Sequence, residues 1–124
     1  SNAAPYSGNY GLGQGIVLNN SSSAEVYYNS VKIDEVASDN SSAAFALYGG
    51  ISNHVFDNIF ANFGRGYSVI FSSVTGSDLD MDYNDIFVGK GYLAKSGNTI
   101  YYSLSEFQTG FGENANSVSA YPGF

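Results

Sequence analysis

The chain has 124 residues, and its eleven acidic side chains against four basic ones give a formal charge of −7 at pH 7. That balance argues against nucleic acid and anionic membrane surfaces as partners, because both reward clusters of lysine and arginine. The absence of cysteine excludes disulfides and thiolate metal sites. Membrane insertion is not expected, because no apolar run approaches the roughly 18 residues of a membrane span. Only 12% of the residues are charged, and abundant Tyr, Phe, Asn, Ser and Gly favour short strands joined by many turns.

The first three residues, Ser1-Asn2-Ala3, are typical of the remnant that cleavage of an expression tag leaves behind. The rest of the chain, residues 4–124, has a length that fits one domain. No signal peptide precedes it, so we expect this domain to be a fragment of a larger protein.

Three similar units follow one another along the chain. Each unit is predicted to begin with an apolar strand and to continue through a polar turn into a second strand, an asparagine corner and a third strand. The apolar runs are residues 15–18, 44–47 and 68–71. The segments around the asparagines are residues 24–33, 53–62 and 79–88.

The corner asparagines, Asn29, Asn58 and Asn84, are spaced 29 and then 26 residues apart. Apolar residues recur three positions before and two positions after each asparagine, and the period of two predicts that these rows point inward. These rows are Val26, Val55 and Met81, and Val31, Phe60 and Ile86.

A unit of this length with three strands fits one coil of a right-handed single-stranded parallel β-helix, a solenoid in which coils stack about 4.8 Å apart. We expect about four coils. Asparagine suits a stacked corner, because its amide both donates and accepts and because it tolerates the left-handed backbone conformation. The alternative is an antiparallel sandwich in which each asparagine only marks a loop.

The C-terminal part is less regular. The sequence Ser103-Leu-Ser-Glu106-Phe predicts a short helical turn near residues 103–108, with Ser103 as N-cap and Glu106 reaching back to it. The tail, residues 116–124, is predicted to be a last strand that ends at Pro122.

The motifs "DYNDIFV" and "YYSLSEFQTGFGENANSVSAYPGF" resemble the closing coils of right-handed parallel β-helix proteins of the pectate-lyase-like superfamily. The earlier motifs "VYYNSVKI" and "HVFDNIFAN" resemble repeats in large secreted or surface proteins of Bacteroidetes-type bacteria. The resemblance implies the β-helix fold and an extracellular or cell-surface location. The resemblance does not identify a function, because lyases, surface proteins and phage tailspikes share this fold. Tyr121 departs from the family pattern, which more often has Asp before the proline.

Asp78, Asp80 and Asp82 have the spacing with which an EF-hand calcium loop begins. The EF-hand interpretation fails, because Tyr83 stands where the loop needs glycine and Gly89 where it needs a bidentate glutamate. A looser Ca²⁺ site on these aspartates stays open as an alternative to the prediction of no cofactor.

Asp80 and Asp82 are also two residues apart on one face of a predicted strand, with Cα atoms roughly 6.5 Å apart. Glycosidases use a pair of carboxylates at comparable separations. Nothing else in the sequence predicts a raised pKa for either group, so solvated surface aspartates are the simpler interpretation.

Aligning the three units places Glu25, His54 and Asp80 in one outward row, and places Tyr27 and Phe56 in a neighbouring outward row. A histidine between two carboxylates is expected to have a raised pKa and could act as a general acid. Alternatively, the rows could form a ledge that binds sugars, since aromatic faces stack on sugar rings. An ordinary charge pair between neighbouring coils is the simplest alternative.

The sequence therefore favours a non-catalytic extracellular module with a surface, adhesion or carbohydrate-contacting role. The alternatives are part of a polysaccharide lyase or glycoside hydrolase of pectate-lyase-like fold, and a purely structural spacer. A lyase needs basic groups around a uronate, and Lys32 is the only one that the alignment places on an outward strand position. The exposed strand edges of a short solenoid also predict end-to-end self-association.

Overall fold

A computed structural model describes residues 13–34 and 41–123 of the chain. The tag remnant predicted at residues 1–3 and the final Phe124 lie outside these described residues. Within them, the strands form three sheets, and the three strands of each sequence unit enter three different sheets.

The first strand of every unit lies in the largest sheet, which is mixed and has the strand order β1-β4-β7-β10-β11. Its members are β1 (Gln14–Asn19), β4 (Ala43–Tyr48), β7 (Tyr67–Ser72), β10 (Tyr92–Ser96) and β11 (Thr99–Tyr101). The second strands form the parallel sheet β2 (Glu25–Tyr27), β5 (Asn53–Phe56) and β8 (Leu79–Asp82). The third strands form the parallel sheet β3 (Ser30–Ile33), β6 (Ile59–Asn62) and β9 (Asp85–Val88).

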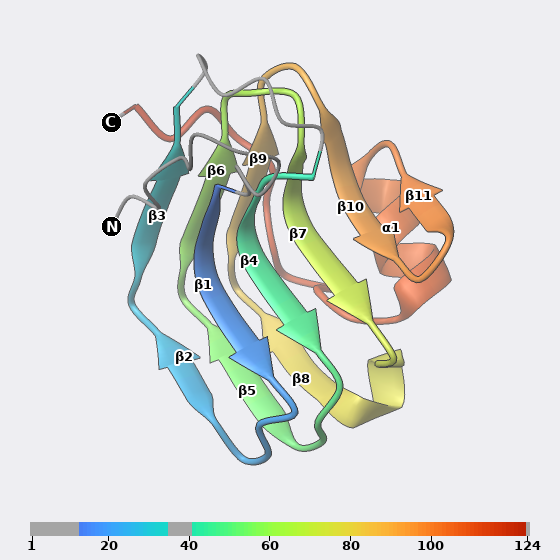
Figure 1. Ribbon diagram of the computed structural model, residues 1–124. Coiled ribbons are helices and arrows are strands. Elements are labelled where there is room, and N and C mark those ends of the chain that lie inside the picture. The colour runs from blue at the N-terminus through green and yellow to red at the C-terminus, as the bar shows by residue number, and fades with distance from the viewer. Residues whose placement is uncertain (1–12, 35–40, 124) are drawn as a thin grey trace.

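Two helical segments complete the described structure. The 3₁₀ segment η1 (Gly76–Asp78) precedes β8, and the helix α1 (Leu104–Phe111) lies beside β10 and β11. Figure 1 shows the largest sheet in front, with the two three-stranded sheets behind it.

Neighbouring units pair in the register that their sequences predict. Val55 in β5 is opposite Val26 on one side and Met81 on the other, and Phe60 in β6 is opposite both Val31 and Ile86. All six residues of these two rows are at most 7% exposed, as the period of two predicts.

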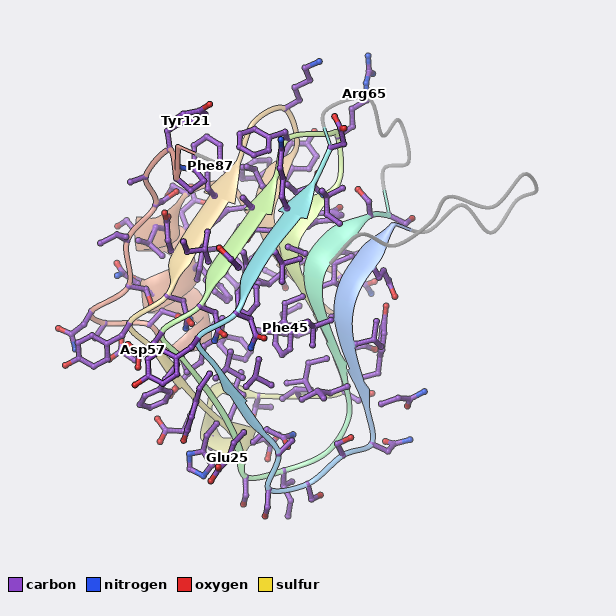
Figure 2. All side chains as sticks on the ribbon, turned by 90° about the vertical axis from the view of Figure 1, so that its left-hand side faces the viewer. Glu25, Phe45, Asp57, Arg65, Phe87 and Tyr121 are labelled. Carbon is purple, nitrogen blue, oxygen red and sulfur yellow. The ribbon has the colours of Figure 1, made fainter. Side chains whose placement is uncertain are left out.

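The interior between the sheets is filled by these rows and by aromatic rings from the largest sheet. Phe45 of β4 stacks on Phe60 with ring centroids 5.0 Å apart, and its ring contacts that of Phe71 edge-on. Figure 2 shows Phe45 in the space between the sheets. Phe107 and Phe111 of α1 extend this core, since both rings contact Phe71.

The predicted right-handed single-stranded parallel β-helix of about four coils is wrong. The described strands form three short sheets, and the largest of them is mixed, because β11 pairs antiparallel with β10. The physical reason lies at Gly97 and Asn98, which separate Ser96 from its partner Thr99. Gly97 has φ +59° and provides the tight reversal of a two-residue hairpin, so the chain turns back where a fourth parallel unit was expected.

The C-terminal part also differs from the prediction. Helix α1 has eight residues, which is longer than a single turn. Ser103 is its N-cap, but the Glu106 carboxylate accepts from the backbone N–H of Tyr102 and not from that of Ser103. The predicted last strand is reduced to one bridge, in which Val118 pairs with Asp85 of β9.

Candidate functional site

The outward row of the β2-β5-β8 sheet contains Glu25, His54 and Asp80. His54 is opposite both acids in the parallel register, and its Nδ1 lies 3.3 Å from Oδ2 of Asp80. The side chains of His54 and Asp80 are 42% and 59% exposed, so the imidazole points to solvent and not into the core. Glu25 lies at the surface, at the far end of the molecule from Arg65 (Figure 2).

The next outward row contains Tyr27, Phe56 and Asp82, which are also opposite one another. The ring centroids of Tyr27 and Phe56 are 6.1 Å apart, within the range of a favourable aromatic pair. Partial burial and then the negative charge of Glu25 raise the pKa of the Tyr27 phenol from its ordinary value.

A third row lies at the turns between the second and third strands, and sequence reasoning missed it. Tyr28, Asp57 and Tyr83 each have φ near +60°, a left-handed conformation that is unusual for a bulky aromatic residue. Their signal in the sequence is position, because each directly precedes a corner asparagine. Holding a residue in this conformation costs about 1–3 kcal/mol, yet the chain places two tyrosines there.

These turns bring four aromatic side chains together, and we call this set the aromatic corner. Tyr28 contacts Tyr27 with ring centroids 6.3 Å apart, and Tyr83 contacts Phe56 at 6.4 Å. Tyr28 is 82% exposed and Tyr83 is 56% exposed. Asp57 lies on the same turn row, at the surface (Figure 2). The aromatic corner therefore presents exposed rings beside the row of Glu25, His54 and Asp80.

The corner asparagines hold these turns in register from inside. Oδ1 of Asn58 accepts from the backbone N–H of Asn29 at 2.9 Å and from its amide at 3.0 Å, and Oδ1 of Asn84 accepts in the same way from Asn58. Asn58 and Asn84 also donate through Nδ2 to the carbonyls of Val26 and Val55. The buried amides thus fix the backbone on which the aromatic corner is carried.

The three aspartates considered as calcium ligands have separate roles. Asp78 caps η1, because its Oδ2 accepts from the backbone N–H and the hydroxyl of Thr75. Asp80 pairs with His54. Within residues 13–34 and 41–123, no three acidic or histidine side chains are grouped so that they could hold a metal ion.

Asp82 anchors the C-terminal segment. Its Oδ1 accepts from the backbone N–H groups of Tyr83 and Asn116, and its Oδ2 accepts from the Asn116 amide. Partial burial alone would raise the pKa of Asp82, but these hydrogen bonds hold it below its usual value. Both oxygens are therefore engaged in structure, which leaves Asp82 poorly suited to pair with Asp80 in catalysis.

Glu113 is a further acid in this region that sequence reasoning missed. Its Oε1 accepts from the backbone N–H of Met81 at 2.8 Å. Burial raises the pKa of Glu113, and the negative charges of Asp80 and Asp82 raise it further against this hydrogen bond. Nothing in the sequence near Glu113 pointed to Met81, because the two residues are 32 positions apart.

No protein-family model, no curated protein and no solved structure matches this chain. The resemblance to β-helix repeat proteins therefore stays a prediction from motifs. Within the described parts of the chain, no helix has the length and apolar character that crossing a membrane requires.

Proposed function

We propose that this chain is a non-catalytic module that binds carbohydrate through the aromatic corner, at the cell surface or outside the cell. The observation that carries this proposal is the placement of four linked aromatic rings, two of them more than half exposed, directly beside three polar side chains. Tyr27, Phe56 and the polar groups lie on neighbouring strands that pair in register, so their spacing is fixed by the sheet. Tyr28 and Tyr83 directly follow two of these strands.

The chemistry of the two rows is complementary to a sugar. The apolar face of a sugar ring stacks on an aromatic side chain, and tyrosine adds a hydroxyl that hydrogen-bonds at the edge. Glu25, His54 and Asp80 provide acceptors and a donor for the ring hydroxyls. Because this polar row carries two carboxylates, the proposed ligand is a neutral or positively charged glycan.

A binding role fits the carboxylates better than a catalytic one. Both oxygens of Asp82 accept hydrogen bonds that hold the C-terminal segment, and Asp80 is paired with His54. A pair of catalytic carboxylates needs one group that is free to attack and one that keeps a proton at neutral pH. The hydrogen bonds to Asp82 serve neither role.

Binding of the protein to an array of neutral, amino and acidic glycans tests the proposal. We expect binding to a neutral or amino glycan that falls at least about tenfold in Tyr27→Ala and in Phe56→Ala, because truncating a central aromatic hot-spot residue costs about 2 kcal/mol or more. Tyr28→Ala is expected to have a smaller effect, since its ring is at the edge of the corner.

Tyr121→Ala is the matched control, because Tyr121 is also an exposed tyrosine, 70% accessible, but contacts Phe63 and Phe87 instead. Thermal denaturation of each variant shows whether the fold is retained. Equal loss of binding in Tyr121→Ala would contradict the proposal, and so would an array without any bound glycan. Release of shorter sugars from the bound glycan would contradict the non-catalytic role.

A further inference from the structure

Two cationic residues occupy equivalent positions in neighbouring loops at the other end of the sheets. The loop between β6 and β7 reads Gly64-Arg65-Gly66 and is followed by Tyr67, and the loop between β9 and β10 reads Gly89-Lys90-Gly91 and is followed by Tyr92. This recurrence of glycine, cation, glycine and tyrosine was visible in the sequence, but its meaning depends on how the loops lie.

The backbones of the two loops run side by side. Gly89 donates its N–H to the carbonyl of Asn62, and Tyr92 donates to the carbonyl of Gly66. A Cβ on Gly91 would collide with the carbonyl oxygens of Gly66 and Arg65, so only glycine allows this approach. Neighbouring paired backbones lie about 4.8 Å apart. Arg65 and Lys90 are therefore carried on loops whose backbones are neighbours.

Both cations are exposed, and within the described residues neither forms an ion pair. Figure 2 shows Arg65 at the top of the molecule, far from the row that contains Glu25. Two like charges on adjacent backbones repel each other, which is unfavourable without a counter-charge. Asp34 follows β3 at this end and reduces the positive potential there.

Aromatic rings accompany the two cations. Tyr67 and Tyr92 are opposite each other in β7 and β10 with ring centroids 6.1 Å apart, and Tyr102 contacts Tyr92 at 5.1 Å. Tyr92 and Tyr102 are 45% and 61% exposed. The exposed ring of Tyr92 thus lies two residues after Lys90 along the chain, and Tyr102 packs against this ring.

We propose that Arg65 and Lys90 form a binding site for the sulfate or carboxylate groups of an anionic polysaccharide, with Tyr92 and Tyr102 contacting its sugar rings. The guanidinium of Arg65 can bind such an oxyanion through two parallel hydrogen bonds, and the Lys90 ammonium adds a second charge. A short stretch of an acidic sugar fits two cations. An extended anionic surface, such as a membrane or nucleic acid, would also meet the acids that give the chain its charge of −7.

Binding of the full chain to heparin, alginate and dextran at low ionic strength, measured by calorimetry, tests this site. We expect heparin or alginate to bind and neutral dextran not to bind. Binding of heparin alone would show that the site recognises sulfate groups, and binding of alginate would show that it recognises carboxylate groups. Arg65→Gln and Lys90→Gln are each expected to weaken binding about threefold and the double variant about tenfold, since exposed charge pairs contribute modestly. Added salt should weaken the wild type more than the double variant.

Lys95→Gln is the matched control, because it removes one positive charge from β10 without touching either loop. A loss in Lys95→Gln equal to that in Lys90→Gln would overturn the proposal, since net charge alone would then explain binding. Capture by phosphatidylserine vesicles without binding to either acidic polysaccharide would also overturn it. Tyr27→Ala should leave heparin and alginate binding unchanged, so the experiments test this site and the aromatic corner independently.

Discussion

The three units from β1 to β9 and the C-terminal segment after β11 satisfy buried amides in different ways. Inside the units, Asn58 bonds to Asn29 on one side and to Asn84 on the other, and its Nδ2 donates to two carbonyls. At the C-terminal segment, the hydroxyl of Ser117 replaces the next asparagine and accepts from the N–H of Asn84. The corner asparagines, in register, hydrogen-bond to one another, whereas Ser117 depends on a separate hydrogen-bond partner.

That partner is Asn114, whose Oδ1 accepts from the Ser117 hydroxyl. The Nδ2 of Asn114 is buried and has no hydrogen-bond partner among the described residues. Most buried polar groups are bonded, and an unmet donor has a cost. Removing an asparagine inside the three units is therefore expected to lower the free energy of unfolding more than removing Ser117 from the C-terminal segment.

The largest effect should follow from Asn58→Ala. The substitution leaves the N–H of Asn29 and the carbonyls of Val26 and Phe56 without their partner in a site that is 2% exposed. We expect the free energy of unfolding to fall by about 3–4 kcal/mol, measured by urea denaturation. Ser117→Ala should cost less, about 1–2 kcal/mol, because it removes two hydrogen bonds, one to the N–H of Asn84 and one to Oδ1 of Asn114. An equal cost for both would contradict this contrast.

Gly91→Ala should have the next largest effect. Its Cβ would collide with backbone oxygens of the neighbouring loop, so the paired backbones must separate, at a cost of about 2–3 kcal/mol. Gly97→Ala is the comparison in the C-terminal hairpin, where the Cβ meets nothing within 4 Å but φ is +59°. We expect Gly97→Ala to lower the stability by only about 1 kcal/mol. Thermal unfolding of both variants compares the two losses, and a larger loss of stability in Gly97→Ala than in Gly91→Ala would refute the prediction.

Asp82→Asn should lower the free energy of unfolding by about 1 kcal/mol at pH 7. Asp82 joins β8 to the C-terminal segment, and a charged acceptor forms stronger hydrogen bonds than a neutral one. The folded-state pKa of Asp82 is lowered, so its contribution is present above the unfolded value and is lost as the pH falls through the folded value. The difference between wild type and variant should therefore shrink below about pH 4. Asp85 has a raised pKa and acts in the opposite direction, but it is common to both proteins. The pKa of Glu113 is also raised, mainly by burial, and loses only the small contribution of the Asp82 charge in the variant. A difference that is constant from pH 7 to pH 2.5 would exclude this role.

The smallest effect is expected for His54→Gln. The ion pair with Asp80 is exposed at 42% and 59%, and such pairs contribute little to stability. We expect the free energy of unfolding to change by less than about 0.5 kcal/mol. A loss above 1 kcal/mol in urea denaturation would place the Glu25, His54 and Asp80 row among the structural elements and not among the binding groups.

Much of the candidate site could be read from the sequence. Alignment of the units placed Glu25, His54 and Asp80 opposite one another, because parallel pairing preserves the spacing from each corner asparagine. The same alignment could not assign Asp82, because its partner Asn116 is 34 residues away and belongs to no unit. Tyr28 and Tyr83 escaped notice because their exposure depends on a left-handed turn that tyrosine seldom adopts.

The sequence by itself determined which residues form strands, which face the interior and which asparagines share a row, because these properties depend on local alternation and on a spacing that recurs. Tertiary structure decided how the chain closes: β11 turns back against β10, α1 adds its two phenylalanines to the core, and the segment after α1 bonds to β8 and β9. These contacts join residues without a shared pattern. Their energy comes from burial and hydrogen bonds that exist only after the units have paired, so no local sequence pattern predicts these contacts.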